Sequence, residues 1–284
     1  MPYKFIKVSD HKGVMRIELS DPSTRNAIGD EMSMELSQEL ERLNTDADLR
    51  VLLLTGTDPA FCSGANVKQM RHDEHKNIDE ANVPHDISPW EYLDREWAKK
   101  DPDSGYMDGV RFMPLKLHRL QKPSIAAVNG YAMGLGMGIA LSCDIRIASD
   151  KALFSETFVK RGLIPADGSC WQLPRMIGLS NTYLLQYTGD TIHAEDAYRM
   201  GLVSKVVSHE SMMEEAIILA ERIASGATYS MSLIKKLLQE SLFVRFDKSL
   251  ELAGTAQNIA RKTEDHKEGV SAFIEKRPPS YKGR

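Results

Sequence analysis

The sequence predicts an α/β fold, and three features support this class. Residues 13–55 have the order strand, amphipathic helix, buried strand, which is typical of a parallel α/β unit with a right-handed crossover. Residues 122–149 contain a second buried strand that runs into closely spaced glycines and then into another short strand. From residue 209 onward the pattern is helical. We therefore expect an α/β body followed by an all-helical tail.

The N-terminal segment is predicted to form a β-hairpin and then a helix. Residues 3–8 and 13–19 alternate apolar and polar side chains, as strands with one buried face do. A helix is predicted to begin near Asp30, because apolar residues follow at helical spacing: Met32, Leu36, Leu40 and Leu43. Residues 51–55 are almost continuously apolar, which indicates a strand buried on both faces.

A long polar excursion, residues 71–121, separates this strand from the next one. Trp90, Leu93 and Trp97 recur at helical spacing and predict a short amphipathic helix, and residues 111–121 predict another. An excursion of this length between two core strands is either a functional lid or a mobile loop.

The centre of the pattern is the stretch KPSIAAVNGYAMGLGMGIALSCDIRIAS, residues 122–149. Residues 124–128 form a buried strand, and three glycines then follow at intervals of two: Gly134, Gly136 and Gly138. Glycines at the start of a helix either permit close packing or leave the first-turn N–H groups free to bind an anion. The spacing differs from G-x-G-x-x-G and no ribose-binding acid follows, so we exclude a dinucleotide site.

A second loop has the same design. Residues 61–68 turn from strand to helix through small side chains, as residues 130–138 do. Both loops would place helix-start N–H groups at the same end of neighbouring strands. Two such donors that converge on one oxygen form an oxyanion hole, and ordinary turn chemistry is the alternative.

Charge and composition narrow the classes of partner. The formal net charge is −4, whereas proteins that bind nucleic acid or membrane surfaces are usually basic. The N-terminus has no apolar signal region, and no apolar run is long enough to span a bilayer. Three scattered cysteines, Cys62, Cys143 and Cys170, have neither disulfide nor metal-ligand spacing. We expect a cytoplasmic protein without nucleic-acid or membrane partners and without a bound metal.

Four segments resemble the signature segments of the crotonase (enoyl-CoA hydratase/isomerase) superfamily: AFCSGANVKQM (60–70), the glycine-rich stretch 122–149, FVKRGLIPADGSCWQLPRMIG (158–178) and GLVSKVV (201–207). They occur in the family's order and, with the flanking segments, cover most of the chain.

The resemblance has consequences for fold, assembly and activity. It implies a crotonase-like spiral of ββα units over residues 1–207, with residues 71–121 forming much of the acyl pocket. It implies that residues 208–284 form a helical oligomerisation region that builds a homotrimer or a dimer of trimers. It also implies an enoyl-CoA hydratase or isomerase activity on an acyl-CoA thioester. No separate cofactor is expected, since coenzyme A enters as part of the substrate.

The resemblance also implies roles for particular residues. The backbone N–H groups of Ala65 and Leu135 would form the oxyanion hole, where fixed donors stabilise the charge of a thioester enolate. The substrate-binding residues would be Ala65, Asn66, Val67, Lys68, Gly134 and Leu135. For Lys68, a solvated position on a helix is the alternative.

The two glutamates of the family's hydratases have no counterpart here, since Gly138 and Phe158 stand at the matching positions. The chemistry still needs a base. Asp167, in the loop LIPADGSCW, is the first candidate, and a turn or helix cap is its alternative role. Glu156 is the second candidate and is expected to point away from the site.

Other reactive side chains are weaker candidates. Cys62 and Cys170 have no histidine near them in the sequence, and buried thiols are usually inert. The histidines of the excursion are possible bases or surface residues, and none has the ligand spacing of a metal site: His72, His75, His85 and His118. The aromatic residues of the excursion are candidates to cover a bulky acyl group or to anchor a helix: Trp90, Tyr92 and Trp97.

Three functions therefore remain open. The first is a hydratase or isomerase that works with one base. The second is a CoA-ester hydrolase or another one-base activity of the superfamily. The third is a catalytically inactive member that binds CoA esters, as the residues at Gly138 and Phe158 would allow.

Overall fold

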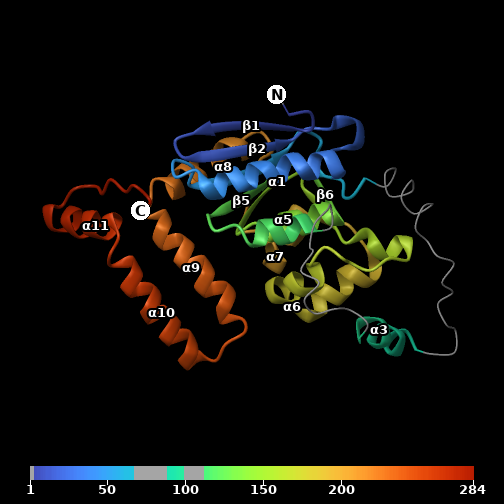
Figure 1. Ribbon diagram of the computed structural model, residues 1–284. Helices are drawn as coiled ribbons and strands as arrows, with labels where there is room; N and C mark the ends of the chain where they lie inside the picture. Colours follow the sequence, from blue (N-terminus) through green and yellow to red (C-terminus); the bar gives the residue numbers. More distant parts are fainter. Residues whose placement is uncertain (1–2, 67–87, 99–111) are drawn as a thin grey trace.

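The computed structural model describes residues 3–66, 88–98 and 112–284. At its centre is a six-stranded sheet (Figure 1). In spatial order its strands are β1 (Ile6–His11), β2 (Val14–Leu19), β3 (Val51–Gly56), β5 (Ser124–Val128), β7 (Ile145–Ser149) and β10 (Lys205–Val207). β1 and β2 form the predicted antiparallel hairpin, and all other neighbours are parallel. The α/β class is confirmed.

Helices cover both faces of this sheet. α1 (Asp30–Thr45) lies on one face and shares a core cluster with Leu52 and Leu54 of β3. α8 (Met212–Ala224) lies on the other face and packs with the alternate residues of β3. β3 is consequently buried along its whole length, as its continuous apolar run predicts.

A second sheet carries the loops of the site. Its strands, in spatial order, are β4 (Ala60–Cys62), β6 (Tyr131–Met133), β8 (Leu153–Ser155) and β9 (Ile192–His193). β4, β6 and β8 are parallel neighbours, so their carboxyl ends lie at one edge. The sequence predicts no strand at β6, because three residues are too few to show an alternation.

The helices predicted in the described residues are present with small shifts at their ends, and a short helix at residues 22–24, which the sequence does not predict, is present as well. The remaining ones are η1 (Pro22–Thr24), α3 (Pro89–Ala98), α4 (Met113–His118), α5 (Leu135–Ser142), η3 (Thr157–Arg161), α6 (Ser169–Thr188), α7 (Ala194–Met200), α9 (Thr228–Ser241), α10 (Phe246–Ala260) and α11 (Glu264–Glu275). α6 is interrupted at Gly178, whose backbone is not helical (φ 76°, ψ 163°), so it consists of two helical segments that meet at a kink. In the described ranges no helix is both long enough and apolar enough to cross a membrane.

The helical tail divides into two parts. α8 belongs to the core, because it covers the large sheet. α9, α10 and α11 extend away from the sheets (Figure 1), and α10 has no buried residue. The domain boundary at residue 207 and the oligomerisation role of residues 208–284 stay predictions.

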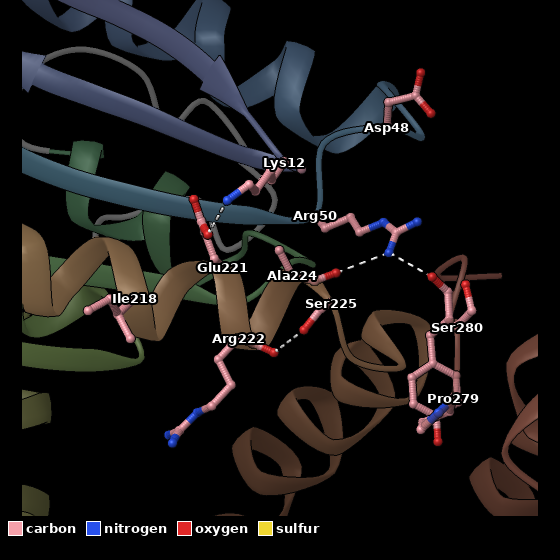
Figure 2. Close-up of a pocket in the computed structure, with 12 residues that line it drawn as sticks. Lys12, Asp48, Arg50, Ile218, Glu221, Arg222, Ala224, Ser225, Pro279 and Ser280 are labelled. Atoms are coloured by element: carbon pink, nitrogen blue, oxygen red, sulfur yellow. Dashed lines mark hydrogen bonds and ion pairs between the residues drawn. The ribbon is translucent and has the colours of Figure 1, made fainter. Parts of the chain in front are cut away.

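The C-terminal tail folds back onto the body of the protein. The carboxylate of Asp265, in the first turn of α11, accepts hydrogen bonds from the backbone N–H groups of residues 282 and 283, at 2.6 and 2.9 Å. Figure 2 shows a second anchor, in which the Arg50 guanidinium donates to the carbonyl oxygens of Ala224 and Tyr281, both at 3.0 Å. The tail thus borders a cavity of about 670 Å³ beside the end of α8.

Candidate active site

Two loops leave the second sheet side by side. One follows β4 and contains Gly64 and Ala65, and the other follows β6 and leads to Leu135 at the start of α5. A methyl group placed on Gly64 would lie 2.9 Å from the carbonyl oxygen of Met133 and 3.9 Å from the backbone nitrogen of Leu135. The two loops therefore touch. The pairing of the short strands β4 and β6 brings these two loops together. The long strands of the large sheet do not carry them directly.

The glycines of the central stretch permit this approach. A methyl group on Gly136 would lie 2.8 Å from the carbonyl carbon of Cys62, so a side chain there would separate α5 from β4. Gly134 has a φ of 50°, a conformation that favours glycine, and a methyl group on it would lie 3.4 Å from the Phe158 ring. Close packing and free backbone donors, the two roles considered for these glycines, are therefore compatible.

Among residues 3–66, 88–98 and 112–284, the backbone N–H groups of Ala65 and Leu135 donate to no protein acceptor. Ile28 pairs with the loop by donating to the Gly64 carbonyl (2.8 Å) and accepting from the Asn66 N–H (2.9 Å). The N–H of Ala65 therefore points to the opposite side of the chain. Leu135 is the first residue of α5, where N–H groups have no acceptor within the helix. Across the described part of the chain neither group donates a hydrogen bond, so both are available to a ligand.

Asp167 brings a carboxylate to the first turns of α5. Its side chain is buried, and a methyl group on Gly138 would lie 2.7 Å from its Cγ atom. The carboxylate therefore fills the space that a side chain at position 138 would take. Its Oδ1 accepts from the Ser169 N–H (3.1 Å), two residues further on, which is the turn role considered for this residue. Its Oδ2 is buried and has no partner within the described residues.

The Glu156 side chain points toward Ser169, the residue that also binds Asp167, so the expectation that it points away from the site is wrong. Its side chain is fully buried, and Oε2 accepts from the Ser169 hydroxyl (2.9 Å). Its Oε1 has no partner among the residues described. The backbone leaves the extended conformation at Glu156 (φ −88°, ψ 68°), between the end of β8 and the start of η3. The two-residue alternation of a strand therefore does not apply there.

Burial shifts the titration of both carboxyls. Burial is the main cause that raises the pKa of Glu156, to about 8, and the neighbouring Asp167 charge raises it further. Burial also raises the pKa of Asp167. Hydrogen bonds from Ser169 act in the opposite direction on both groups. A negative charge on Asp167 therefore disfavours a second negative charge on Glu156.

Two polar residues that the sequence did not single out complete the surroundings. Ser169 contacts both carboxyls, and its place two residues after an aspartate is the usual spacing of a local cap. The Gln172 side-chain amide donates to the Ser142 hydroxyl (2.9 Å), and its Oε1 is unpartnered within the described ranges. No comparable local signal marks Gln172, because its role depends on how α5 and α6 pack.

Asp167 also borders a cavity of about 420 Å³ between α4 and the start of α6. Most of its lining is apolar or aromatic: Phe112, Pro114, Leu115, His118, Ala166, Asp167, Gly168, Trp171, Gln172 and Phe243. Trp171 and Phe243 stack with their ring centroids 5.9 Å apart, and His118 meets the Trp171 ring edge-on at 5.4 Å. Burial lowers the pKa of His118, which favours its neutral form. The cavity suits an apolar or aromatic group next to a carboxylate.

The other predicted site residues have different outcomes. Burial raises the pKa of Cys62 to about 12, so it stays a thiol, and the pKa of Cys170 is also raised. Trp90 is 81% exposed and covers nothing in the described part of the chain. Several candidates lie outside the described residues: Val67, Lys68, His72, His75, His85 and the Trp97 side chain.

Comparison with known proteins agrees with this fold. The family model for enoyl-CoA hydratase/isomerase matches residues 9–96 and 91–284. The chain is 34% identical to 1,2-epoxyphenylacetyl-CoA isomerase of Escherichia coli (strain K12), with 99% of each chain covered. It is 32% identical to 2,3-dehydroadipyl-CoA hydratase of the same strain, with 98% of each covered.

A solved structure is similar over the whole chain. The crystal structure of an enoyl-CoA hydratase from Bacillus anthracis superposes with a TM-score of 0.82 at 31% identity, covering 99% of this chain and all of the other. The match of the family model and the full-length similarity to these proteins lead to one conclusion. The chain belongs to the enoyl-CoA hydratase/isomerase family of the crotonase superfamily, whose members are acyl-CoA enzymes.

Proposed function

We propose that this enzyme moves a proton on an acyl-CoA thioester, with Asp167 as the base and the N–H groups of Ala65 and Leu135 as the oxyanion hole. The observation that carries the proposal is the buried, unpartnered Oδ2 of Asp167, which lies over Gly138, three residues after Leu135 on the same helix. The proposed base thus lies against the first turn of α5, whose first residue carries one of the two proposed donors.

The chemistry follows from this arrangement. The Asp167 carboxylate takes a proton from the carbon next to the thioester carbonyl, and the electron pair moves onto the thioester oxygen. Each backbone donor that faces this oxygen stabilises the developing charge by about 3 kcal/mol, as in other oxyanion holes. The protonated Asp167 then returns the proton to the γ-carbon, which shifts the double bond. Asn66, Val67, Lys68 and Gly134 are proposed to bind the coenzyme A part, and no separate cofactor takes part.

Isomerisation is the first candidate reaction, because a single base can take up and return the proton. The 34% identical relative named as an isomerase supports this choice. Hydration is the second candidate, since water must be activated while a proton is delivered, and the buried Glu156 carboxyl provides a second titratable group. The cavity beside Asp167 supports an apolar or aromatic acyl group.

Proton exchange in deuterated water tests the base. Wild-type enzyme is incubated with 3-hexenoyl-CoA, crotonyl-CoA and phenylacetyl-CoA, and deuterium uptake and product are followed by mass spectrometry. Asp167→Asn is expected to lower the exchange rate by about 10²–10⁴-fold, the usual contribution of a general base. The exposed Asp190→Asn variant is the matched control and should exchange like wild type.

Each other outcome has a definite meaning. Wild-type exchange in Asp167→Asn would exclude Asp167 as the base. Release of free coenzyme A would indicate the hydrolase alternative. Tight binding of the CoA esters without exchange or turnover in the wild-type protein would indicate an inactive binding member.

The same assay tests the Leu135 donor. Leu135→Pro removes the N–H, and proline is tolerated at the first residue of a helix. Because the buried leucine side chain is lost as well, Leu135→Ala, which keeps the N–H, is the control. We expect the proline variant to be about 10²-fold slower than the alanine variant. Equal rates in two folded variants would exclude this donor.

We also propose that the protein assembles as a homotrimer or a dimer of trimers through α9, α10 and α11. Apolar side chains on these helices are largely exposed in the single chain: Ile234, Leu238, Phe246, Leu250 and Phe273. A surface of this kind is usually covered by another protein surface.

A further inference from the structure

We propose that Glu156 and Asp167 act as one proton-sharing pair, held by Ser169, in which Glu156 keeps the shared proton and Asp167 stays ionised. The proposal deepens the proposed function and rests on it, because it takes Asp167 as the base. Glu156 acts here as a positioning residue for the charge on Asp167. Its role is to keep the resting site at a single negative charge.

Ser169 joins the two side chains. Its backbone N–H donates to Oδ1 of Asp167 (3.1 Å), and its hydroxyl donates to Oε2 of Glu156 (2.9 Å). One oxygen of each carboxyl is thus fixed, and the other oxygen of each is buried without a donor within the described residues. A buried carboxylate oxygen without a donor is costly, and protonation of one group removes part of that cost.

No cation in the described ranges offsets a second negative charge. The basic residues that lie between Glu156 and Asp167 in the sequence are Lys160 and Arg161 on η3. The Lys160 ammonium lies 3.7 Å from the Asp190 carboxylate, and the Arg161 guanidinium donates to the Thr157 hydroxyl at 3.3 Å. Both cationic groups are therefore engaged away from the pair.

The other titratable groups near the pair are neutral. The Cys170 thiol on α6 has a pKa raised by burial and by both carboxyl charges, so it remains protonated. His118 on α4 lines the same cavity as Asp167, and burial lowers its pKa. Two carboxyls without a positive partner ionise in two separate steps, so between these steps the pair holds one proton and one charge.

The shared proton fits the proposed reaction. At rest the pair has one charge, on Asp167, and one proton, on Glu156. When Asp167 takes the substrate proton, both carboxyls are neutral and the negative charge lies on the thioester oxygen. When the proton returns to the substrate, the pair regains its single charge. The Glu156 proton is not consumed in the cycle, and its role is to prevent a second charge next to the forming enolate.

Carbon-13 NMR of carboxyl-labelled protein tests the pair without any substrate. In wild type we expect one of the two carboxyls to remain protonated at neutral pH. Asp167→Asn removes the neighbouring charge and should lower the midpoint of the Glu156 titration by about one pH unit or more. Spectra of Glu156→Gln assign the Glu156 signal. An unchanged Glu156 midpoint in Asp167→Asn, or two ionised carboxyls in wild type at neutral pH, would refute the pair.

The pH dependence of turnover of the best substrate gives a second readout. Glu156→Gln imitates the protonated acid, so the alkaline inflection of kcat/KM should disappear. Ser169→Ala removes the hydroxyl donor to Glu156 and should move that inflection to higher pH. Thr182→Ala, which removes another buried hydroxyl of α6, should leave the profile unchanged. An alkaline inflection that persists in Glu156→Gln would count against the proposal.

The two proposals fail separately. If Asp167→Asn retains exchange while NMR shows a coupled pair, then Asp167 is not the base but the pair exists. If Asp167→Asn is inactive and the two carboxyls titrate independently, then the base is correct and the pair is not.

Discussion

At the scale of single residues, the Glu156 carboxyl links the site to the stability of the fold. Its pKa rises from an ordinary value of 4.5 to about 8 on folding. Between these values the native protein binds more protons at this position than the unfolded chain does. The free energy of unfolding therefore falls as the pH rises through this window. The buried Glu156 carboxyl therefore lowers the free energy of unfolding at alkaline pH.

Glu156→Gln is expected to remove this pH dependence. The variant should exceed wild type in unfolding free energy by a few kcal/mol at about pH 9, where wild-type Glu156 is ionised, and differ little at about pH 5. Urea denaturation at both pH values measures the difference. Glu214→Gln, at an exposed site on α8, is the control and should change neither value. Parallel pH curves for Glu156→Gln and wild type would show that this carboxyl is not strained by folding.

The sequence identified Asp167 as the first candidate base, which stays a prediction, and it gave the Glu156 side chain the wrong direction. Asp167 was found because the family's acyl-pocket loop contains it, and its burial agrees with that place. Glu156 was assigned the wrong direction because the strand β8 ends one residue earlier, and sequence patterns locate strand ends poorly. Ser169 carries a weak local signal, and Gln172 carries none.

At the scale of elements, α5 is the part of the fold on which the site depends. Its first residue supplies a free N–H, and its fourth residue, Gly138, leaves room for the Asp167 carboxylate. The glycines that let α5 approach β4 are the same ones that expose its first turn. A change at any of them therefore alters both packing and the site.

Gly138→Ala is expected to displace the Asp167 carboxylate, because the added methyl group would lie 2.7 Å from its Cγ atom. A shift of about 1 Å at a catalytic group lowers turnover by up to about 10²-fold. We expect the variant to fold and its kcat to fall by about tenfold or more, because the carboxylate would be displaced by only part of that distance. The control is Gly254→Ala on α10, where the added methyl group meets nothing within 4 Å. It should keep wild-type kcat and raise stability by about 0.5–1 kcal/mol. Wild-type kcat in Gly138→Ala would show that the carboxylate position is not critical.

The length of an element decided whether the sequence revealed it. Strands of five or six residues in the large sheet show their pattern, and so do the helices of the tail. β4, β6 and β9 have two or three residues each, too few for a period, although β4 and β6 lead into the loops of the site. The sequence correctly predicted that residues 61–68 and 130–138 form neighbouring loops. It did not predict β6, one of the strands that bring these loops together.

At the scale of the whole molecule, the exposed apolar side chains of α10 predict assembly. The mass of one chain is 31.8 kDa, and light scattering coupled to gel filtration should give about three or six times this value. A double change, Phe246→Asp with Leu250→Asp, should shift the mass toward one chain, because both side chains are more than half exposed on a helix with no buried residue. Lys248→Gln on the same helix is the control. A wild-type protein of one-chain mass at micromolar concentration would refute the assembly.

The sequence could predict the helices of the tail but not the surface that each one covers. α8 and α10 are both amphipathic, yet α8 lies on the large sheet and α10 contacts no core. An amphipathic pattern shows that a helix has an apolar face, and it does not identify the partner of that face. The C-terminal tail anchored by Arg50 and Asp265 was likewise invisible, because its hydrogen bonds use backbone groups.

The contact between Gly138 and Asp167 has a consequence for how relatives of this enzyme are compared. A side chain at position 138 would occupy the space that the Asp167 carboxylate fills. An acidic side chain at position 138 therefore excludes an acid at position 167 that points toward α5. An alignment that inspects position 138 alone would classify this chain as lacking an acid, although the Asp167 carboxylate lies directly beside Gly138. Positions 138 and 167 should therefore vary together among relatives, and the acid is better traced by its location in space than by its column in an alignment.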